Sequence, residues 1–207
     1  MNNAWTFDDS VAVRFQHEAE SHIPSYHTVI EKCINFAIKN LQKTDLIIDV
    51  GSALGFTIKK FKDAGFTNIV GVENSPAMIA RSLFPDLVTE SSSLPVNRYK
   101  LILANWTLHF VNDKVAYLQN VYNCLDNGYF ILTDKTEQSD LVKNMYYDFK
   151  RSKGVSDQYI FEKETQLQGI MVSKQISWYI KTLENIGFQF EIIHADLGFV
   201  TFLCSKS

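Results

Sequence analysis

A short loop with a carboxylate at its start has the residue types needed to bind a polar ligand. It runs from Asp49 to Gly55 in the pattern D-x-G-x-x-x-G. An apolar run, Leu46–Val50, precedes it and is typical of a buried parallel strand. Apolar residues at helical spacing follow it. Such a strand, loop and helix place backbone N–H groups at the carboxyl end of the strand, where open α/β sheets bind ligands.

Two more carboxylates follow at the ends of the next two predicted strands. Glu73 lies 22 residues after Gly51, a spacing at which a carboxylate accepts hydrogen bonds from ribose hydroxyls. Glu90 is followed by a polar loop and is placed to accept a hydrogen bond from an adenine amino group. Together with the glycine loop, the two residues predict an adenosine ligand whose tail lies over the loop.

Asp49 indicates which adenosine ligand is bound. A pyrophosphate tail favours a loop rich in donors, whereas a carboxylate at the start of the loop favours a cation. We therefore predict S-adenosyl-L-methionine (SAM) rather than NAD as the cofactor.

The elements that position these residues alternate along the chain. Expected strands are 46–50, 68–72, 87–89, 99–105, 129–133, 188–194 and 199–204, and expected helices include 8–16, 25–42, 56–63, 76–83 and 113–125. We expect Asp8 or Asp9, Ser25 and Ser75 to cap helices. Residues 126–128 and 196–198 are predicted turns, and 136–183 are mostly helical with a break at Gly154.

This order predicts a Rossmann-like α/β fold with a seven-stranded, mostly parallel sheet and an antiparallel C-terminal hairpin. The length of 207 residues favours a single domain over residues 1–207. Within it we expect an N-terminal helical arm (1–45), a cofactor half (46–134), a helical cover (135–186) and the hairpin (187–207).

Composition limits the classes of function. A net charge of -3 gives no overall electrostatic reason for tight, non-specific nucleic-acid binding. The three cysteines, Cys33, Cys124 and Cys204, are widely spaced and predict buried thiols rather than a metal site. The sequence shows neither a signal peptide nor an apolar run long enough for a membrane span, so we expect a cytoplasmic protein.

Several stretches carry a resemblance to a known family. They are residues 7–13, IPSYHTVI, DVGSALG, ENSPAMI, ANWTLHF and NMYYDFKRSKG, in order along nearly the whole chain. The chain resembles the class I SAM-dependent methyltransferases, and within them it is similar to the carboxy-S-adenosyl-L-methionine synthases of transfer-RNA wobble-uridine modification. DVGSALG is common to the superfamily, whereas SPAMI and NMYYDFKRSKG are specific to the narrower group.

The resemblance implies a role for each matching residue. Tyr26 would cover the cofactor; Gly51, Ser52 and Ala53 would line its methionine part; Glu73 would bind the ribose; Asn74, Glu90 and Ser91 the adenine; and Asn105 the methionine end. Asp49 and Gly55 complete the predicted cofactor set. The resemblance also implies a homodimer through residues 136–183.

One position departs from the narrower family. After the NM-x-x-DFKR motif that family has a lysine and then an arginine that holds the extra carboxylate of its product, whereas this chain has Lys163 and Glu164. A carboxylate there would repel the group that an arginine holds, unless Lys163 or Arg151 replaces it.

Residues for proton chemistry are few. Asn105 and His109 are weak catalytic candidates, and both residue types are common in caps or cores. Asn105 is not followed by the Pro-Pro-aromatic run of nucleobase amino methyltransferases, and no cysteine follows a proline, which disfavours direct methylation of DNA bases. Lys143, Lys150, Arg151 and Lys153 are expected to form a solvated helix face, with RNA or an acidic partner as the alternative.

Three functions remain open from the sequence. The first is a SAM-dependent methyltransferase that acts on a small molecule or RNA, with little side-chain chemistry beyond orientation. The second is a carboxy-SAM synthase that uses prephenate. The third is a SAM-binding scaffold protein without catalysis.

Overall fold

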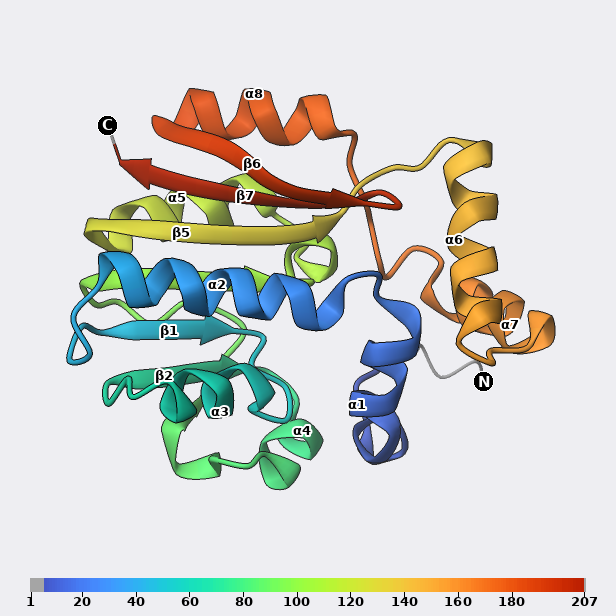
Figure 1. Ribbon diagram of the computed structural model, residues 1–207, viewed down its shortest axis with the longest axis horizontal. Helices are drawn as coiled ribbons and strands as arrows, with labels where there is room; N and C mark the ends of the chain where they lie inside the picture. The colour runs from blue at the N-terminus through green and yellow to red at the C-terminus, as the bar shows by residue number, and fades with distance from the viewer. Residues whose placement is uncertain (1–5, 207) are drawn as a thin grey trace.

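A seven-stranded sheet forms the centre of the protein in the computed structural model, which describes residues 6–206 (Figure 1). Its order is β3-β2-β1-β4-β5-β7-β6. The strands are β1 (Ile47–Val50), β2 (Ile69–Glu73), β3 (Val88–Glu90), β4 (Tyr99–Asn105), β5 (Leu125–Lys135), β6 (Phe188–Asp196) and β7 (Phe199–Lys206). Strands β1 to β5 pair in parallel, and β7 is antiparallel to both β5 and β6. The predicted Rossmann-like α/β fold with an antiparallel C-terminal hairpin is confirmed.

Helices cover both faces of the sheet. They are α1 (Asp9–His22), α2 (Tyr26–Asn40), α3 (Phe56–Asp63), α4 (Pro76–Arg81), α5 (Lys114–Cys124), α6 (Asp140–Ser152), α7 (Asp157–Leu167) and α8 (Ile176–Ile186). Successive strand residues face opposite sides, so that Ile48 packs with the residues of α5 and α8 while Ile47 packs with those of α2 and α3. Each face of the sheet therefore has its own apolar core.

The carboxyl ends of the parallel strands point toward α1 on one side and α6 with α7 on the other (Figure 1). Tyr159 of α7 donates its hydroxyl to Glu18 of α1 at 2.5 Å, and Tyr146 of α6 donates to the carbonyl of His22 at 2.8 Å. These contacts join the N-terminal helix to the helices that follow β5, and the three helices enclose the end of the sheet.

Most predicted boundaries agree with the structure, and the N-terminal arm differs. Asp8 and Ser75 cap α1 and α4 as predicted, each accepting a hydrogen bond from a backbone N–H group. Helix α1 continues to His22, past the predicted end at residue 16. Ser25 precedes α2 but does not cap it, because it has a φ of 57° and donates its hydroxyl to Asp196 at 2.7 Å.

The predicted turn at residues 126–128 is wrong, because these residues belong to β5. The register with β4 shifts between Tyr99 and Leu101, and Asn127 has a φ of 43°. A Cβ atom at Gly128 would lie 2.5 Å from the carbonyl oxygen of Lys100, so only glycine fits. The turn-forming residues 126–128 therefore form an irregular start of β5.

The second predicted turn is confirmed as a two-residue hairpin link. Leu197 and Gly198 have φ of 45° and 84°, as the primed hairpin turns require. The break at Gly154 is confirmed between α6 and α7. The three cysteines are free and buried, as predicted. In residues 6–206, no helix is long and apolar enough to cross a membrane.

Candidate functional site

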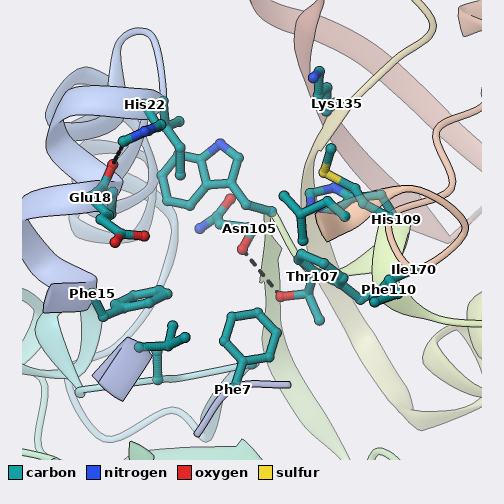
Figure 2. A pocket seen from close by; sticks show the side chains of 18 of the residues that line it. Phe7, Phe15, Glu18, His22, Asn105, Thr107, His109, Phe110, Lys135 and Ile170 are labelled. Carbon is teal, nitrogen blue, oxygen red and sulfur yellow. Dashed lines mark hydrogen bonds between the residues drawn. The ribbon is translucent and has the colours of Figure 1, made fainter. Parts of the chain in front are cut away.

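A cavity of about 880 Å³ lies at the carboxyl edge of the parallel strands. Its walls are the loop between β1 and α3, the ends of β2 and β4, helix α1, the start of α2, and α6 with α7. Figure 2 shows Glu18 and His22 of α1 on one side of it and His109 and Lys135 on the other, with Asn105 and Thr107 between them.

The glycine loop forms the floor of the cavity through Gly51, Ser52 and Ala53. Gly51 has a φ of 68°, and a Cβ atom there would lie 2.4 Å from the Thr107 hydroxyl oxygen. That hydroxyl donates to the carbonyl of Val50 at 3.0 Å. Close approach of the β4 end therefore requires glycine. Gly55 does not line the cavity; it precedes α3 with a φ of 78°.

Glu73 holds the loop against the end of β2. Its Oε1 accepts hydrogen bonds from the backbone of Asn74 and Ser75 at 2.8 and 2.9 Å, and its Oε2 accepts one from the backbone of Ala53 at 3.0 Å. The side chain is buried and lines the cavity. A carboxylate has about four acceptor sites, so Glu73 retains capacity for a ligand hydroxyl.

Asp49 lies at the bottom of the cavity and is 4% exposed. Burial, together with the neighbouring charge of Glu73, raises its pKa to about 8. At neutral pH these surroundings therefore favour the protonated acid. A cationic ligand group beside Asp49 would favour the ionised form, and this refines the role that the sequence indicated.

A buried polar atom at the end of β4 points to a ligand. Within residues 6–206, Asn105 Oδ1 has no hydrogen-bond partner although it is buried, and the same is true of Ser52 Oγ in the glycine loop, next to Gly71. Asn105 Nδ2 donates to Cys33 Sγ at 3.8 Å, which fixes the amide. Tyr26 stacks on Trp106 with ring centroids 4.8 Å apart and covers this end of the cavity.

The structure separates one predicted residue from the others. Asn74 and Ser91 line the cavity, but Glu90 does not. Glu90 pairs in register with Glu73, at the end of the edge strand β3, and is exposed to solvent. Its neighbour Ser91 turns inward instead.

The far end of the cavity contains two lysines that the sequence analysis did not place in the site. Lys135 ends β5 and Lys150 belongs to α6. Their ammonium groups lie 4.7 and 4.4 Å from the centroid of the Tyr146 ring. Burial lowers the pKa of Lys135 to about 8, and burial with the repulsion of Lys135 lowers that of Lys150 to about 7. The expectation of a solvated helix face is therefore wrong for Lys150, which is 7% exposed.

Glu164 also lines the cavity, but its charge is compensated. Its carboxylate forms an ion pair with Lys143 and accepts a hydrogen bond from the Tyr147 hydroxyl. Lys163 lines the cavity too and contacts Glu18 at 2.9 Å. Arg151, in contrast, binds Asp148 and Asp157 at the surface, so it does not replace an arginine in the site.

His109 forms a buried network with two residues that the sequence did not connect to it. Its Nδ1 contacts Asp134 Oδ1, and Tyr179 donates its hydroxyl to Asp134 Oδ2 at 2.6 Å. Asp134 is fully buried, and His109 is 4% exposed and lines the cavity. No sequence signal links the three residues, because they come from three separate elements.

Comparison with known proteins agrees with this geometry. Residues 18–171 match the methyltransferase domain family, which covers most of the chain. The chain belongs to the class I SAM-dependent methyltransferases. It is accordingly an enzyme, a SAM-dependent transferase, and the interpretation as a scaffold without catalysis is set aside.

Individual relatives show both sequence and fold similarity. The carboxy-S-adenosyl-L-methionine synthases of Erwinia tasmaniensis and Yersinia enterocolitica are 28% and 29% identical, over 96% of this chain and 88% and 81% of theirs. The magnesium protoporphyrin IX methyltransferase of Synechocystis, solved with S-adenosylhomocysteine, superposes with a TM-score of 0.69 at 10% identity, over 97% of this chain and 96% of its own.

The near end of the cavity, beside the glycine loop, has residues that fit SAM. Asp49 offers a carboxylate for a cation, Glu73 has acceptor capacity for hydroxyls, and Asn105 Oδ1 lacks a partner within the described chain. The far end of the cavity is lined by Lys135, Lys150 and His109.

Proposed function

We propose that this methyltransferase acts on a small molecule that carries a carboxylate or similar anionic group and binds inside the cavity. The lysine pair, Lys135 and Lys150, carries the proposal. Within residues 6–206 neither ammonium group forms an ion pair, although both are largely removed from bulk water. Glu164 is the acidic group that acts on both lysines, and its carboxylate already forms an ion pair with Lys143. A ligand anion close to the two buried ammonium groups would therefore stabilise both.

The enclosure of the site favours a small acceptor over RNA. The cavity volume of about 880 Å³ is within the usual range for small-molecule sites, and it must hold the cofactor as well. Helices α1, α6 and α7 are joined across it by the Tyr159–Glu18 and Tyr146–His22 hydrogen bonds. The basic residues of α6 do not form the exposed basic face that RNA binding would need. Lys150 is buried, and Arg151 forms an ion pair with Asp148.

SAM supplies an electrophilic methyl group on a sulfonium, and the residues named above hold and orient it. We propose that Tyr26, Asp49, Gly51, Ser52, Ala53, Glu73, Asn74, Ser91 and Asn105 bind the cofactor, with Gly55 shaping the loop. Tyr26 and Trp106 exclude water from the near end by stacking. The lysine pair then orients the acceptor toward the cofactor.

Carboxy-SAM synthesis is the second candidate. It is favoured by the similarity to the synthases over 96% of the chain, and the lysine pair offers a site for the additional carboxylate of that product. Glu164 counts less against it than the sequence suggested, because Lys143 and Tyr147 compensate its charge.

Mass spectrometry of the purified protein distinguishes the two candidates. We expect SAM or S-adenosylhomocysteine as the retained ligand, and no carboxylated cofactor after incubation with SAM and prephenate.

Calorimetry in the presence of S-adenosylhomocysteine then tests the lysine pair with two matched probes, 4-hydroxybenzoate and its neutral amide. We expect the acid to bind at least about tenfold more tightly, with the difference lost in Lys150→Met. Equal binding of acid and amide would contradict the anionic acceptor.

We also propose a homodimer through α6 and α7. Leu141, Met145 and Phe161 are 71%, 51% and 51% exposed on these helices. Leu141 and Met145 are four residues apart and so lie on one face of α6, and exposed apolar side chains of this size are typical of an association site. Sedimentation of the wild type and of Leu141→Ser tests this, because Leu141 is exposed and does not line the cavity. A monomeric wild type at micromolar concentration would contradict it.

A further inference from the structure

The far end of the cavity holds a histidine that the proposed function has not yet used. His109 follows β4 in a short 3-10 helix, Leu108–Phe110, and lines the cavity on the same side as Lys135 (Figure 2). Its backbone N–H also lies 3.3 Å from Asp134 Oδ1, so both the main chain and the ring of His109 contact the same carboxylate.

The contacts of Asp134 determine which ring nitrogen of His109 faces the ligand. Tyr179 can only donate to Oδ2, and the His109 backbone N–H donates to Oδ1, so the carboxylate acts as an acceptor. The ring nitrogen Nδ1 therefore carries a proton, and in the neutral ring Nε2 has the lone pair. Within residues 6–206, Nε2 has no hydrogen-bond partner, and it is not among the fully enclosed atoms.

We propose that His109 is the general base of the reaction and that the acceptor group is a hydroxyl. This deepens the proposed function, on which it rests. A carboxylate acceptor would need no base, whereas a hydroxyl must lose its proton as it is methylated. A histidine oriented by a buried carboxylate is the arrangement that such a proton transfer needs. Asp134 and Tyr179 are positioning residues.

The transfer balances without another reactant. A lone pair of the acceptor oxygen forms the new C–O bond as the C–S bond of the donor breaks, with its electron pair left on the sulfur of S-adenosylhomocysteine. The hydroxyl proton passes to His109 Nε2, and the imidazolium charge lies against the Asp134 carboxylate. The proton later leaves to water.

The surroundings of the ring support this role. The Phe110 ring lies 4.5 Å from the His109 ring between centroids, and Ile170 and Met171 line the same end of the cavity. Apolar neighbours exclude water and strengthen the ion pair that forms on proton transfer. The charged and titratable groups around the network are Asp134 of β5, Tyr179 of α8, Lys114 of α5, and Glu137 and Lys174 of the connecting segments.

The experiment uses 4-hydroxy-3-nitrobenzoate, whose phenolate absorbs visible light, bound together with S-adenosylhomocysteine. The carboxylate of this probe suits the lysine pair, and its hydroxyl reports proton transfer. In the wild type we expect the ionisation midpoint of the bound phenol to fall by about one pH unit or more relative to the free probe. In His109→Gln most of that shift is lost, and His27→Gln, an exposed histidine of α2, is the matched control.

A second measurement uses no probe. Ring-nitrogen NMR of ¹⁵N-histidine protein should show His109 with its proton on Nδ1 at neutral pH, and Asp134→Asn should mix the two tautomers. A phenolate shift unchanged in His109→Gln, a proton on Nε2, or a wild type that does not bind the probe would each overturn the inference. Calorimetry with S-adenosylhomocysteine distinguishes failure of this inference from failure of the proposed function. A wild type that does not bind S-adenosylhomocysteine contradicts the proposed function itself.

Discussion

The two ends of the cavity are held together in different ways. At the cofactor end, the Glu73 carboxylate and the Thr107 hydroxyl bind backbone groups of adjacent strand ends. At the acceptor end, side chains bind side chains far along the chain, as in Tyr159–Glu18, 141 residues apart. The first end depends on the sheet, and the second depends on how three helices pack. We therefore expect changes at the cofactor end to affect binding and folding together, and changes at the acceptor end to affect them separately.

The largest effect should follow from Glu73→Ala. It leaves three backbone N–H groups without their acceptor and removes the proposed partner of the ribose. We expect binding of SAM to weaken by about 100-fold and the free energy of unfolding to fall by about 2–4 kcal/mol. Calorimetry and urea denaturation measure the two. Glu73→Gln keeps one acceptor oxygen, so its SAM affinity and stability should lie between those of the wild type and of Glu73→Ala. Normal SAM binding by Glu73→Ala would contradict the proposed site.

The same contrast explains what the sequence could predict. Asp49, Gly51 and Glu73 belong to two adjacent strand ends, and their relation follows from the strand–loop–helix order alone. His109, Asp134 and Tyr179 meet only because β4, β5 and α8 pack together, with separations of 25 and 45 residues. Lys150 looked like a surface residue because it belongs to a set of basic residues with Lys143, Arg151 and Lys153, and its burial depends on the packing of α6 against α1 and α7. Contacts set by tertiary packing leave no local pattern.

Glu18→Gln tests the acceptor end by loosening α7 from α1. Glu18 accepts hydrogen bonds from Tyr159 and Lys163 at 2.5 and 2.9 Å. Burial acts to raise its pKa, but these bonds and Arg14 outweigh burial and lower it to about 2. A lowered carboxyl pKa stabilises the fold above the ordinary value of 4.5, and that stability is lost as pH falls from about 4.5 to 2.

We expect Glu18→Gln to reduce the free energy of unfolding by about 2 kcal/mol at pH 7 and to flatten this acid limb. Urea denaturation at pH values from about 3 to 7 measures both effects, because this range includes pH values at which the Glu18 carboxyl titrates. Glu20→Gln, on the same helix with an exposed side chain, is the matched control. Unchanged SAM binding in Glu18→Gln would support the separation of the two ends, and an unaltered acid limb would contradict the role of Glu18.

Lys150→Met should increase stability while it impairs acceptor binding. The folded pKa of about 7 lies below the ordinary 10.5, so the unfolded chain binds more protons between these values and stability rises with pH across them. Near pH 7 the variant should gain about 1 kcal/mol, because the burial cost of the amine is removed. Thermal unfolding from about pH 6 to 9 measures this, with the exposed Lys153→Met as the control. If Lys150→Met were less stable than the wild type, this would contradict the view that Lys150 serves ligand binding at a cost in stability.

The smallest effect should follow from Glu90→Ala, which tests the one predicted cofactor residue that lies outside the cavity. Thr89 and Glu90 are both exposed at the end of the edge strand β3, and Ser91, whose backbone N–H donates to the Glu73 carbonyl at 2.9 Å, turns toward the cavity instead. An exposed carboxylate gains little by binding an amino group, since water competes for both. We expect calorimetry to show SAM binding weakened by less than about threefold and stability changed by less than about 0.5 kcal/mol. A tenfold loss would mean that the end of β3 moves inward when the cofactor binds, and the cofactor end would then depend on a rearrangement as much as the acceptor end does.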